Sequence, residues 1–510
     1  MNKQEAFFNH ITEGNTNKGE YITLGSAMLD GKTIKNAFVN VPLKTMNRHG
    51  LIAGATGTGK TKTLQVLAEN LSEKGVPVIL MDIKGDLSGL AQPSPGHAKI
   101  DERHEAIGLP FEPKAFPVEI LTLSAQNGVR LRATISEFGP VLISRILDVT
   151  ETQAGIISVI FKYCDDNKLP LLDLKDFKKI LQYATDEGKK EFEEAYGRIS
   201  TASTGAILRK IVELEQQGGD LFFGEKSFDP QDLLRVDENG RGYINIIRLT
   251  DIQDKPKLFS TFMLSLLAEI YSTFPEQGDT GRPELIMFID EAHLIFNEAS
   301  KALLNQIESI VKLIRSKGVG LYFVTQNPTD VPEAVLSQLG LKVQHALRAF
   351  TAKDRKAIKL TAQNYPDTEY YDTANVLTSL GTGEALVSAL NEKGRPTPLA
   401  ATMMRAPMSR MDILTDTELE NLRHNSKLVK KYNEEVDRES AYEMLNEKIE
   451  QAEAEELKEK ARKEKEALEK AKSKSTSSRK STRMNPIVKV LTSATFIRSV
   501  FGILTKVMKK

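Results

Sequence analysis

Short apolar runs alternate along the chain with longer segments of helical period. Each run has about five to eight nearly continuous apolar residues, the pattern of strands that are buried on both faces of a parallel sheet. The intervening segments, such as 61–75 and 300–318, have the period of amphipathic helices. This alternation predicts an α/β fold with a doubly wound, mainly parallel sheet. The predicted strands lie in residues 49–54, 76–82, 118–124, 242–250, 284–290, 318–326 and 341–350.

One long stretch of helical period, residues 134–235, interrupts this alternation. We interpret it as an all-helical subdomain inserted into the α/β core. The insertion divides the core into residues 46–133 and 236–408. Before the core, residues 1–45 contain short alternating pieces that suit a small β element.

The composition changes again from residue 409, and residues 409–471 predict a charged helical extension. Its later part is rich in Glu, Lys and Ala, with pairs four residues apart such as Glu456–Lys460 and Glu459–Lys463. Apolar seam positions are sparse, which favours a solvated single helix over a coiled coil.

The C-terminal residues 472–510 contain no Asp or Glu and ten Lys or Arg. Residues 472–483 have the composition of a disordered basic linker, and residues 484–510 form an apolar helical pattern with basic positions that exclude a membrane span. The helix could bind peripherally to a membrane, dock on a partner protein or pack within its own oligomer. The linker could also contact DNA phosphates.

A glycine-rich motif follows the first predicted core strand. Residues 54–61, GATGTGKT, fit G-x-x-x-x-G-K-[ST], between an apolar strand and an amphipathic helix. In this motif Lys60 reaches the β- and γ-phosphates, and the Thr61 hydroxyl binds Mg²⁺. A glycine turn without a ligand is the disfavoured alternative. The predicted nucleotide-binding residues are Gly54, Ala55, Thr56, Gly57, Thr58, Gly59, Lys60, Thr61 and Lys62.

Two adjacent acids, Asp290 and Glu291, end the predicted strand 284–290. Asp290 could hold Mg²⁺, usually through water, and Glu291 could take a proton from the attacking water. Two acids at the end of a buried strand are costly without a cation or a mechanism, which disfavours a purely structural role. A GTPase would carry an N-K-x-D motif, which the sequence lacks.

A third polar position, Gln326, follows Thr325 at the end of another apolar run. In a doubly wound sheet this strand would lie beside the strand that leads into the glycine-rich loop. The Gln326 amide could then contact the γ-phosphate or the water. The alternative is a glutamine that only caps a turn.

These motifs, in this order, resemble the HerA-like branch of the HerA/FtsK-type P-loop ATPases. Segments 47–61, 81–91, 288–296 and 315–332 carry the resemblance, which covers about residues 20–405. It implies a RecA-like core and a homo-oligomer, generally a hexameric ring, with ATP bound between neighbouring subunits. Several relatives pump or remodel double-stranded DNA.

The resemblance also assigns roles to single residues. Arg315 lies where hexameric relatives have an arginine finger that reaches the neighbour's γ-phosphate. An arginine at a helix C-terminus can also act only on the helix dipole, and Arg348 is a second candidate for the finger. Asp82, Lys84 and Asp86 match the family's D-x-K-G-D signature. Their chemistry is unassigned, and a salt-bridged loop is the alternative.

The sequence also departs from two related patterns. Larger HerA relatives begin with a β-barrel that docks a partner nuclease, and residues 1–45 are few for such a barrel, which leaves a nuclease partner in doubt. Residues 290–293 read DEAH, yet no Q-x-x-G-R-x-x-R motif of the DEAH-box helicases follows.

Composition adds limits to this interpretation. The 510 residues carry a formal net charge of zero, so no overall basic field indicates nucleic acid or an anionic membrane. The single cysteine, Cys164, cannot form an internal disulfide, and an inert buried thiol is favoured over a reactive one. The N-terminus lacks the apolar core of a signal peptide, and no uncharged run approaches the ~20 residues of a membrane span. We expect a cytoplasmic protein, with peripheral membrane contact left open.

Two functions from different classes follow. The first is a Mg²⁺-dependent ring ATPase that uses ATP to move DNA, and the DNA part depends on the family resemblance. The second is an ATP-driven oligomeric switch that acts on a protein or membrane through the basic tail. A small-molecule kinase is disfavoured, because Glu291 beside Asp290 suits the activation of water and no acceptor pocket is visible.

Overall fold

The structure is a computed structural model that describes residues 2–475, apart from 125, 253, 279, 299, 300, 435 and 437. Most of the predicted basic tail, including the helical pattern of residues 484–510, lies outside the described residues. The chain divides into two compact units, residues 1–445 and 446–510.

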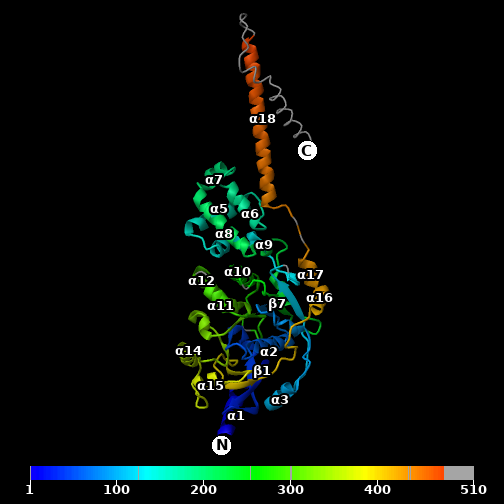
Figure 1. Ribbon diagram of the computed structural model, residues 1–510, viewed down its shortest axis with the longest axis vertical. Coiled ribbons are helices and arrows are strands. Elements are labelled where there is room, and N and C mark those ends of the chain that lie inside the picture. The colour runs from blue at the N-terminus through cyan, green and yellow to red at the C-terminus, as the bar shows by residue number, and fades with distance from the viewer. Residues whose placement is uncertain are drawn as a thin grey trace. The chain divides into compact units, whose positions relative to one another are not determined.

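A twelve-stranded sheet runs through the described part of the first unit (Figure 1), in the order β2-β1-β12-β11-β10-β3-β9-β8-β4-β7-β5-β6. The eight strands from β10 to β6 pair in parallel, and the four at the other end pair antiparallel. The strands are β1 (Tyr21–Leu29), β2 (Lys32–Pro42), β3 (Gly50–Ala53), β4 (Val78–Asp82), β5 (Val118–Thr122), β6 (Val129–Arg130), β7 (Ile244–Arg248), β8 (Leu285–Ile289), β9 (Val319–Thr325), β10 (Leu341–His345), β11 (Glu384–Ser388) and β12 (Ala400–Met404).

This sheet confirms the predicted α/β class, and every predicted core strand is present. The apolar runs became β3, β4, β5, β7, β8, β9 and β10, whose residues are almost all buried. The predicted neighbourhood is also confirmed, because β3 pairs in parallel with β9. Residues 21–42 add two antiparallel strands to the same sheet, since β1 pairs with β12 and β2 with β1.

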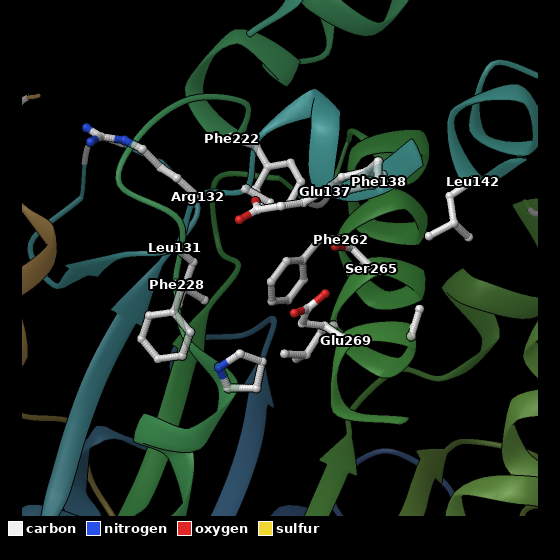
Figure 2. A pocket seen from close by; sticks show the side chains of 14 residues that line it. Leu131, Arg132, Glu137, Phe138, Leu142, Phe222, Phe228, Phe262, Ser265 and Glu269 are labelled. Carbon is white, nitrogen blue, oxygen red and sulfur yellow. The ribbon is translucent and has the colours of Figure 1, made fainter. Parts of the chain in front are cut away.

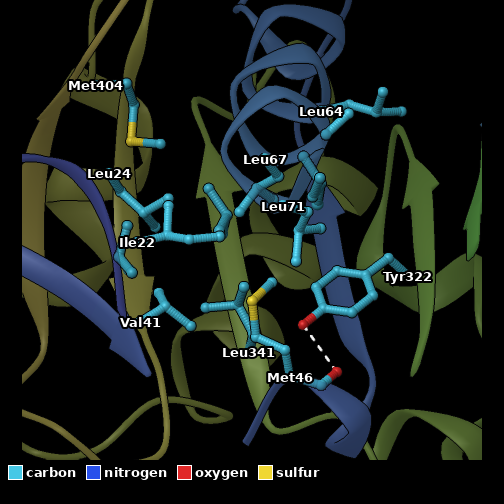
Figure 3. Packing of buried hydrophobic residues seen from close by; sticks show 14 of the residues in the cluster. Ile22, Leu24, Val41, Met46, Leu64, Leu67, Leu71, Tyr322, Leu341 and Met404 are labelled. Carbon is cyan, nitrogen blue, oxygen red and sulfur yellow. Dashed lines mark hydrogen bonds between the residues drawn. The ribbon is translucent and has the colours of Figure 1, made fainter. Parts of the chain in front are cut away.

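The helix that follows the glycine-rich loop, α2 (Lys60–Glu73), packs its apolar stripe on the sheet. Figure 3 shows Leu64, Leu67 and Leu71 of this helix in one cluster with side chains from β1, β10 and β12. These three leucines are essentially fully buried, and each contributes about 2 kcal/mol from burial. Tyr322 on β9 completes this cluster. Its hydroxyl donates to the Met46 carbonyl at 3.1 Å. The buried leucines thus hold α2 against the sheet, and the tyrosine bond joins β9 to η1 (Leu43–Arg48) within the same cluster.

A group of helices lies between β6 and β7 in the chain. Capping boxes at Thr134, Thr150 and Asp173 begin three of them. The helices are α4 (Ile135–Ile146), α5 (Glu151–Asp166), α6 (Leu174–Tyr183), α7 (Lys189–Tyr196), α8 (Thr201–Gln216) and α9 (Gly219–Phe222).

A small pocket lies beside α4 and α10 (Pro256–Thr273), as Figure 2 shows. Phe138, Phe222 and Phe262 give it an aromatic wall, and the Glu137 and Glu269 carboxylates lie at the same pocket. Glu137 is used locally, because it accepts hydrogen bonds from the Thr134 N–H and the Ser227 hydroxyl.

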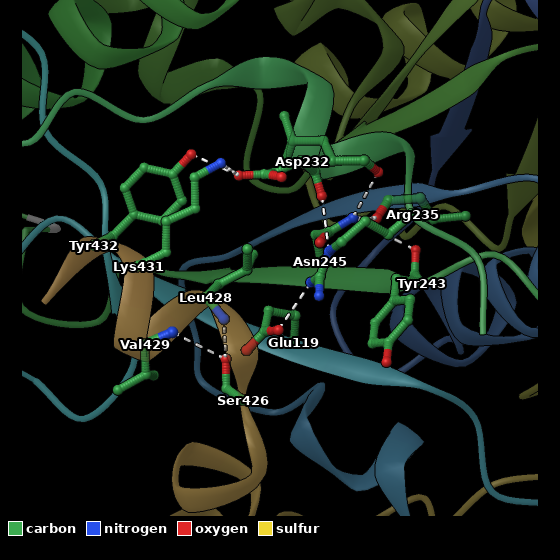
Figure 4. A network of polar contacts seen from close by, with 12 residues as sticks. Glu119, Asp232, Arg235, Tyr243, Asn245, Ser426, Leu428, Val429, Lys431 and Tyr432 are labelled. Carbon is green, nitrogen blue, oxygen red and sulfur yellow. Dashed lines mark hydrogen bonds and ion pairs between the residues drawn. The ribbon is translucent and has the colours of Figure 1, made fainter. Parts of the chain in front are cut away.

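Residues 405–432, which the sequence pattern assigns mainly to a charged extension, cross the first unit as a strap. Its last helix, α17 (Lys427–Tyr432), begins at Ser426, whose hydroxyl accepts from the Leu428 and Val429 N–H groups (Figure 4). The Lys431 ammonium and the Tyr432 hydroxyl both bind the Asp232 carboxylate. These contacts connect positions about two hundred residues apart, which local periodicity cannot reveal.

The last described helix, α18 (Ala441–Ser475), carries residues 446–475 of the second unit. Residues 451–470 are exposed, and ion pairs join Glu456 to Lys460 at 2.7 Å and Glu459 to Lys463 at 2.8 Å. Among the residues that the structure describes, no helix has the length and apolar character needed to cross a bilayer.

The other helices are α1 (Lys3–Gly14), α3 (Ala98–Ile107), α11 (His293–Glu298), α12 (Lys301–Ile314), α13 (Glu333–Leu336), α14 (Ala352–Ala362), α15 (Thr373–Ser379) and α16 (Asp416–Asn425). Short 3₁₀ turns are η1 (Leu43–Arg48), η2 (Ser88–Ala91), η3 (Pro230–Leu234), η4 (Arg315–Lys317) and η5 (Pro328–Asp330).

Candidate nucleotide site

Four sequence motifs meet at one edge of the sheet. The strands β3, β9, β8 and β4 are consecutive neighbours and run in parallel, so their carboxyl ends lie side by side. The glycine-rich loop follows β3, Gln326 follows β9, and Asp290 with Glu291 follows β8. The Asp-x-Lys-Gly-Asp loop follows β4. In open α/β sheets, ligands bind outside the carboxyl ends of the strands.

The glycine-rich loop has the backbone that its glycines predict. Gly57 has φ of +78° and Gly59 of +111°, in the region that favours glycine. A Cβ atom added to Gly57 would meet nothing within 4 Å, so the loop faces open space there. The N–H groups of the first turn of α2 have no acceptor within the helix and can face a phosphate.

Three of the predicted phosphate-binding residues use their N–H groups within the protein, and Thr58 does so inside the loop, where its N–H donates to the Ala55 carbonyl at 3.4 Å. The Gly54 N–H donates to the Thr325 carbonyl at 3.3 Å, and the Ala55 N–H donates to the Ala346 carbonyl at 2.9 Å. These bonds fasten the start of the loop to the strand ends of β9 and β10. The sequence motif alone does not distinguish these anchoring residues from the residues that surround the opening.

Lys60 lies folded over this loop. Its ammonium donates to the Ala55 carbonyl at 3.2 Å, and only 7% of the residue is exposed. Burial lowers the pKa of Lys60, and the nearby Lys84 charge lowers it further, while Glu291 and Asp290 oppose this shift. Lys60 therefore lies between the loop and the two acids that the sequence predicted as its partners.

The adjacent acids are both buried at the end of β8. Burial raises the pKa of Asp290 to about 6, and its carboxylate accepts the Glu291 N–H at 2.9 Å. Glu291 has φ of +46°, an uncommon conformation for a residue with a side chain. Its Oε1 forms an ion pair with Lys84, and its Oε2 lies 3.2 Å from His293 Nδ1. This contact with His293 is not a hydrogen bond, so Oε2 has no hydrogen-bond donor among the described residues.

Gln326 is exposed at the end of β9. The turn that follows is closed by Asp330, whose carboxylate accepts from the Thr325 hydroxyl at 2.6 Å and from the Asn327 N–H at 3.1 Å. Because Asp330 holds this turn, capping does not account for Gln326 at this position.

Arg315 is not brought to this site within one chain. It lies in η4, which precedes β9, and so at the opposite edge of the sheet. Arg348 follows β10 and is exposed, two residues after Ala346, whose carbonyl anchors the glycine-rich loop. Of the two arginines, only Arg348 lies at the same edge as the site in its own subunit.

The sequence analysis did not single out His345, which joins the end of β10 to β11 and to α2 beside the glycine-rich loop. Its Nδ1 lies 2.8 Å from the Glu384 carbonyl oxygen, and its Nε2 lies 2.9 Å from the Thr63 hydroxyl on α2. Burial lowers the pKa of His345 to about 4, so the neutral ring donates to the carbonyl and accepts from Thr63. The only signal in the sequence is a histidine at the end of an apolar strand.

The donor set fits a nucleoside triphosphate with Mg²⁺. Gly57 leaves the space that a phosphate needs, and the Thr61 hydroxyl and Asp290 are oxygen ligands of the kind that Mg²⁺ prefers. Glu291 Oε2 and Asp86 Oδ1 are buried oxygen atoms with no donor among the described residues, as expected where water or a ligand is to bind.

Comparison with known proteins agrees with this geometry. A family model described as "Helicase HerA-like C-terminal" matches residues 28–509. The chain belongs to this HerA-like family.

Curated relatives carry related names. The DNA double-strand break repair helicase HerA of Sulfolobus acidocaldarius is 23% identical over 376 residues, which cover 70% of this chain and 66% of that protein. The DNA import protein CedB of the same organism is 23% identical over 373 residues, which cover 73% of this chain and 54% of that protein. The chain thus spans just under two thirds of the length of the first relative and about half of the second.

Among solved structures, the bacterial conjugative coupling protein TrwB in its unbound monoclinic form matches with a TM-score of 0.51. The match covers 80% of this chain and 95% of that one, at 15% identity. This likeness supports the RecA-like P-loop fold that the sequence resemblance implied.

Proposed function

We propose that this HerA-like chain hydrolyses ATP with Mg²⁺ and uses the energy to translocate or remodel double-stranded DNA. The observation that carries the proposal is the convergence of Lys60, Asp290 and Glu291 beside an open glycine-rich loop. A purely structural role would leave two buried acids and a buried lysine without a function.

Each residue takes a role in this proposal. The N–H groups around Gly57 and Gly59 bind phosphate oxygens, and Lys60 leaves the Ala55 carbonyl to bind the β- and γ-phosphates. The Thr61 hydroxyl and Asp290 hold Mg²⁺, which neutralises phosphate charge when bound.

Glu291 accepts a proton from the attacking water through Oε2, the carboxylate oxygen that has no donor among the described residues. Gln326, exposed at the end of β9, contacts that water or the γ-phosphate.

The proposed assembly is a homo-oligomeric ring, a hexamer by analogy with the family. A site at one edge of the sheet and Arg315 at the other suit an arrangement in which each subunit completes its neighbour's site. Arg315 then acts as the arginine finger in trans, with Arg348 as the second candidate.

The DNA part is supported by the relatives, whose names include a DNA repair helicase and a DNA import protein. Strong coupling to DNA would appear as faster ATP turnover in its presence. The decisive experiment measures ATP turnover of the full chain with duplex DNA, single strands, anionic vesicles or no addition, with Lys60→Ala as the blank. We expect stimulation by duplex DNA, and a loss of about a hundredfold or more in the Lys60→Ala variant.

Stimulation by vesicles alone would contradict DNA translocation and favour the oligomeric switch. Equal turnover of Lys60→Ala and the unmodified chain would contradict ATP hydrolysis at this site altogether.

A further inference from the structure

The loop after β4 places a second lysine at the proposed ATP site. Asp82, the last residue of β4, accepts hydrogen bonds from the N–H groups of Gly85 at 2.7 Å, Asp86 at 3.2 Å and Leu87 at 3.2 Å. These three bonds fold the loop back on its own strand. Lys84 projects from the part of the loop that they enclose, toward the neighbouring strand β8.

Lys84 meets Glu291 at this point. The Lys84 ammonium forms an ion pair with Glu291 Oε1, and the two side chains differ in exposure. The Lys84 side chain is 43% exposed, whereas that of Glu291 is 8% exposed. The lysine can therefore leave through solvent, while the carboxylate stays in place.

Lys84 supplies one of the two lysine charges near the acids of the site. Lys60 and Lys84 both interact with Asp290 and Glu291, and Asp86 adds a further carboxylate near Lys84. A bound triphosphate adds more negative charge next to Glu291, and charge-assisted bonds from lysine to phosphate are among the strongest available. Lys84 then has a better partner than Glu291 at the site.

We propose that Lys84 pairs with Glu291 when no ATP is bound and transfers to the γ-phosphate when ATP binds. The transfer takes the ammonium charge away from the Glu291 carboxylate, so the carboxylate is unpaired and accepts the proton of the attacking water only when a γ-phosphate is present. Loss of the γ-phosphate returns Lys84 to Glu291. This assigns a role to the Asp-x-Lys-Gly-Asp loop, and it depends on the proposed function of the site.

Binding of nucleotide analogues tests the transfer without turnover. The affinities of a fluorescent ADP and of a non-hydrolysable ATP analogue are measured for the full chain and for Lys84→Met, Glu291→Gln and the double variant. We expect Lys84→Met to weaken the ATP analogue by about ten- to a hundredfold and to change ADP binding by less than about threefold. Lys114→Met removes a surface lysine of similar exposure, 39%, that pairs with Glu73 at 3.4 Å, and should change neither affinity.

The double variant separates phosphate binding from simple neutralisation of Glu291. If Lys84 binds the γ-phosphate, Lys84→Met still weakens the ATP analogue in the Glu291→Gln background. If Lys84 only screens the carboxylate, that second substitution has no effect, and the proposal is overturned. Equal losses for ADP and the ATP analogue would overturn it as well.

A different result is expected if the proposed ATP site itself is wrong. Lys60→Ala should abolish binding of both nucleotides, and unchanged binding in that variant would remove the proposed ATP site itself. Unfolding temperatures of all variants, expected to agree with the unmodified chain, confirm that a lost affinity is not a lost fold.

Discussion

Glu69 on the glycine-loop helix α2 accepts hydrogen bonds from Ser409, which lies 340 residues later in the chain. Its carboxylate binds the Ser409 N–H at 2.9 Å and the Ser409 hydroxyl, and it also accepts the Met408 N–H at 2.8 Å. The Gln65 amide donates to the same hydroxyl at 2.7 Å. The strap at residues 405–432 is thus fixed to the helix that begins in the proposed phosphate site.

Replacement of Ser409 by alanine should destabilise the first unit by about 1–2 kcal/mol, because it leaves the buried Gln65 amide and Glu69 carboxylate short of one partner each. Urea unfolding measures this loss. Ser158→Ala, at an exposed hydroxyl on α5 that bonds only within its helix, should cost less than about 0.5 kcal/mol. Equal effects of the two substitutions would show that the strap contributes nothing at this point.

Glu69 should also make stability depend on pH. Burial raises its pKa from the ordinary 4.5 to about 7, while the Ser409 and Met408 donors and the Arg405 charge oppose the shift. A raised pKa means that the folded state holds the proton longer, so this contribution is full below about pH 4.5 and is lost as the pH rises through about 7. From about pH 5 to about pH 8, the unmodified chain should lose about 2–3 kcal/mol relative to Glu69→Gln.

The free energy of unfolding of both proteins is measured across this pH range. Subtracting the value for Glu69→Gln from that for the unmodified chain removes the contribution of all other titrating groups. A difference that stays constant with pH would show that Glu69 remains ionised throughout. A difference of the opposite sign would place its pKa below the ordinary value.

Gly57→Ala should separate backbone strain from ligand binding. Gly57 and Gly31 have nearly the same φ, +78° and +76°, and a Cβ atom would meet nothing within 4 Å at either. Each substitution should therefore cost about 1 kcal/mol of stability from the left-handed backbone alone. Only Gly57→Ala puts a methyl group into the open side of the phosphate loop, so only it should weaken ATP-analogue binding, by about tenfold or more. Equal binding by the two variants would mean that phosphate does not lie beside Gly57.

The local pattern of the chain was enough to predict the centre of the sheet and to choose motifs that follow neighbouring strands of it. Strands buried on both faces have nearly continuous apolar sequences, which is why β3, β8 and β9 could be recognised. The parallel arrangement then places the residues that follow those strands at one edge. The strands β11 and β12 were not predicted, because they are partly built from alanine and methionine, which have little β preference.

Contacts between distant segments could not be predicted in this way. The ion pair between Lys84 and Glu291 depends on β4 and β8 being neighbours, although other strands separate them in the chain. The bond from His345 to Thr63 likewise joins β10 to α2. Hydrophobic periodicity reports which face of an element is buried and not which element covers it.

Mixed oligomers offer the sharpest test of Arg315. It lies at the sheet edge opposite Glu291, so in the proposed ring it acts on the neighbour's ATP and not on its own. Arg315→Ala and Glu291→Gln should each abolish most ATP turnover when assembled alone. The two variants are then dissociated and reassembled together in equal amounts. At about a quarter of the interfaces, a subunit that keeps Glu291 lies next to a subunit that keeps Arg315.

Turnover of the mixture should then rise above that of both parents, toward about a quarter of the unmodified value if sites act independently. A mixture that stays at the parents' level, with reassembly verified by subunit exchange between fluorescently labelled chains, would remove Arg315 as the finger. The same mixing with Arg348→Ala would then show whether that arginine acts in trans.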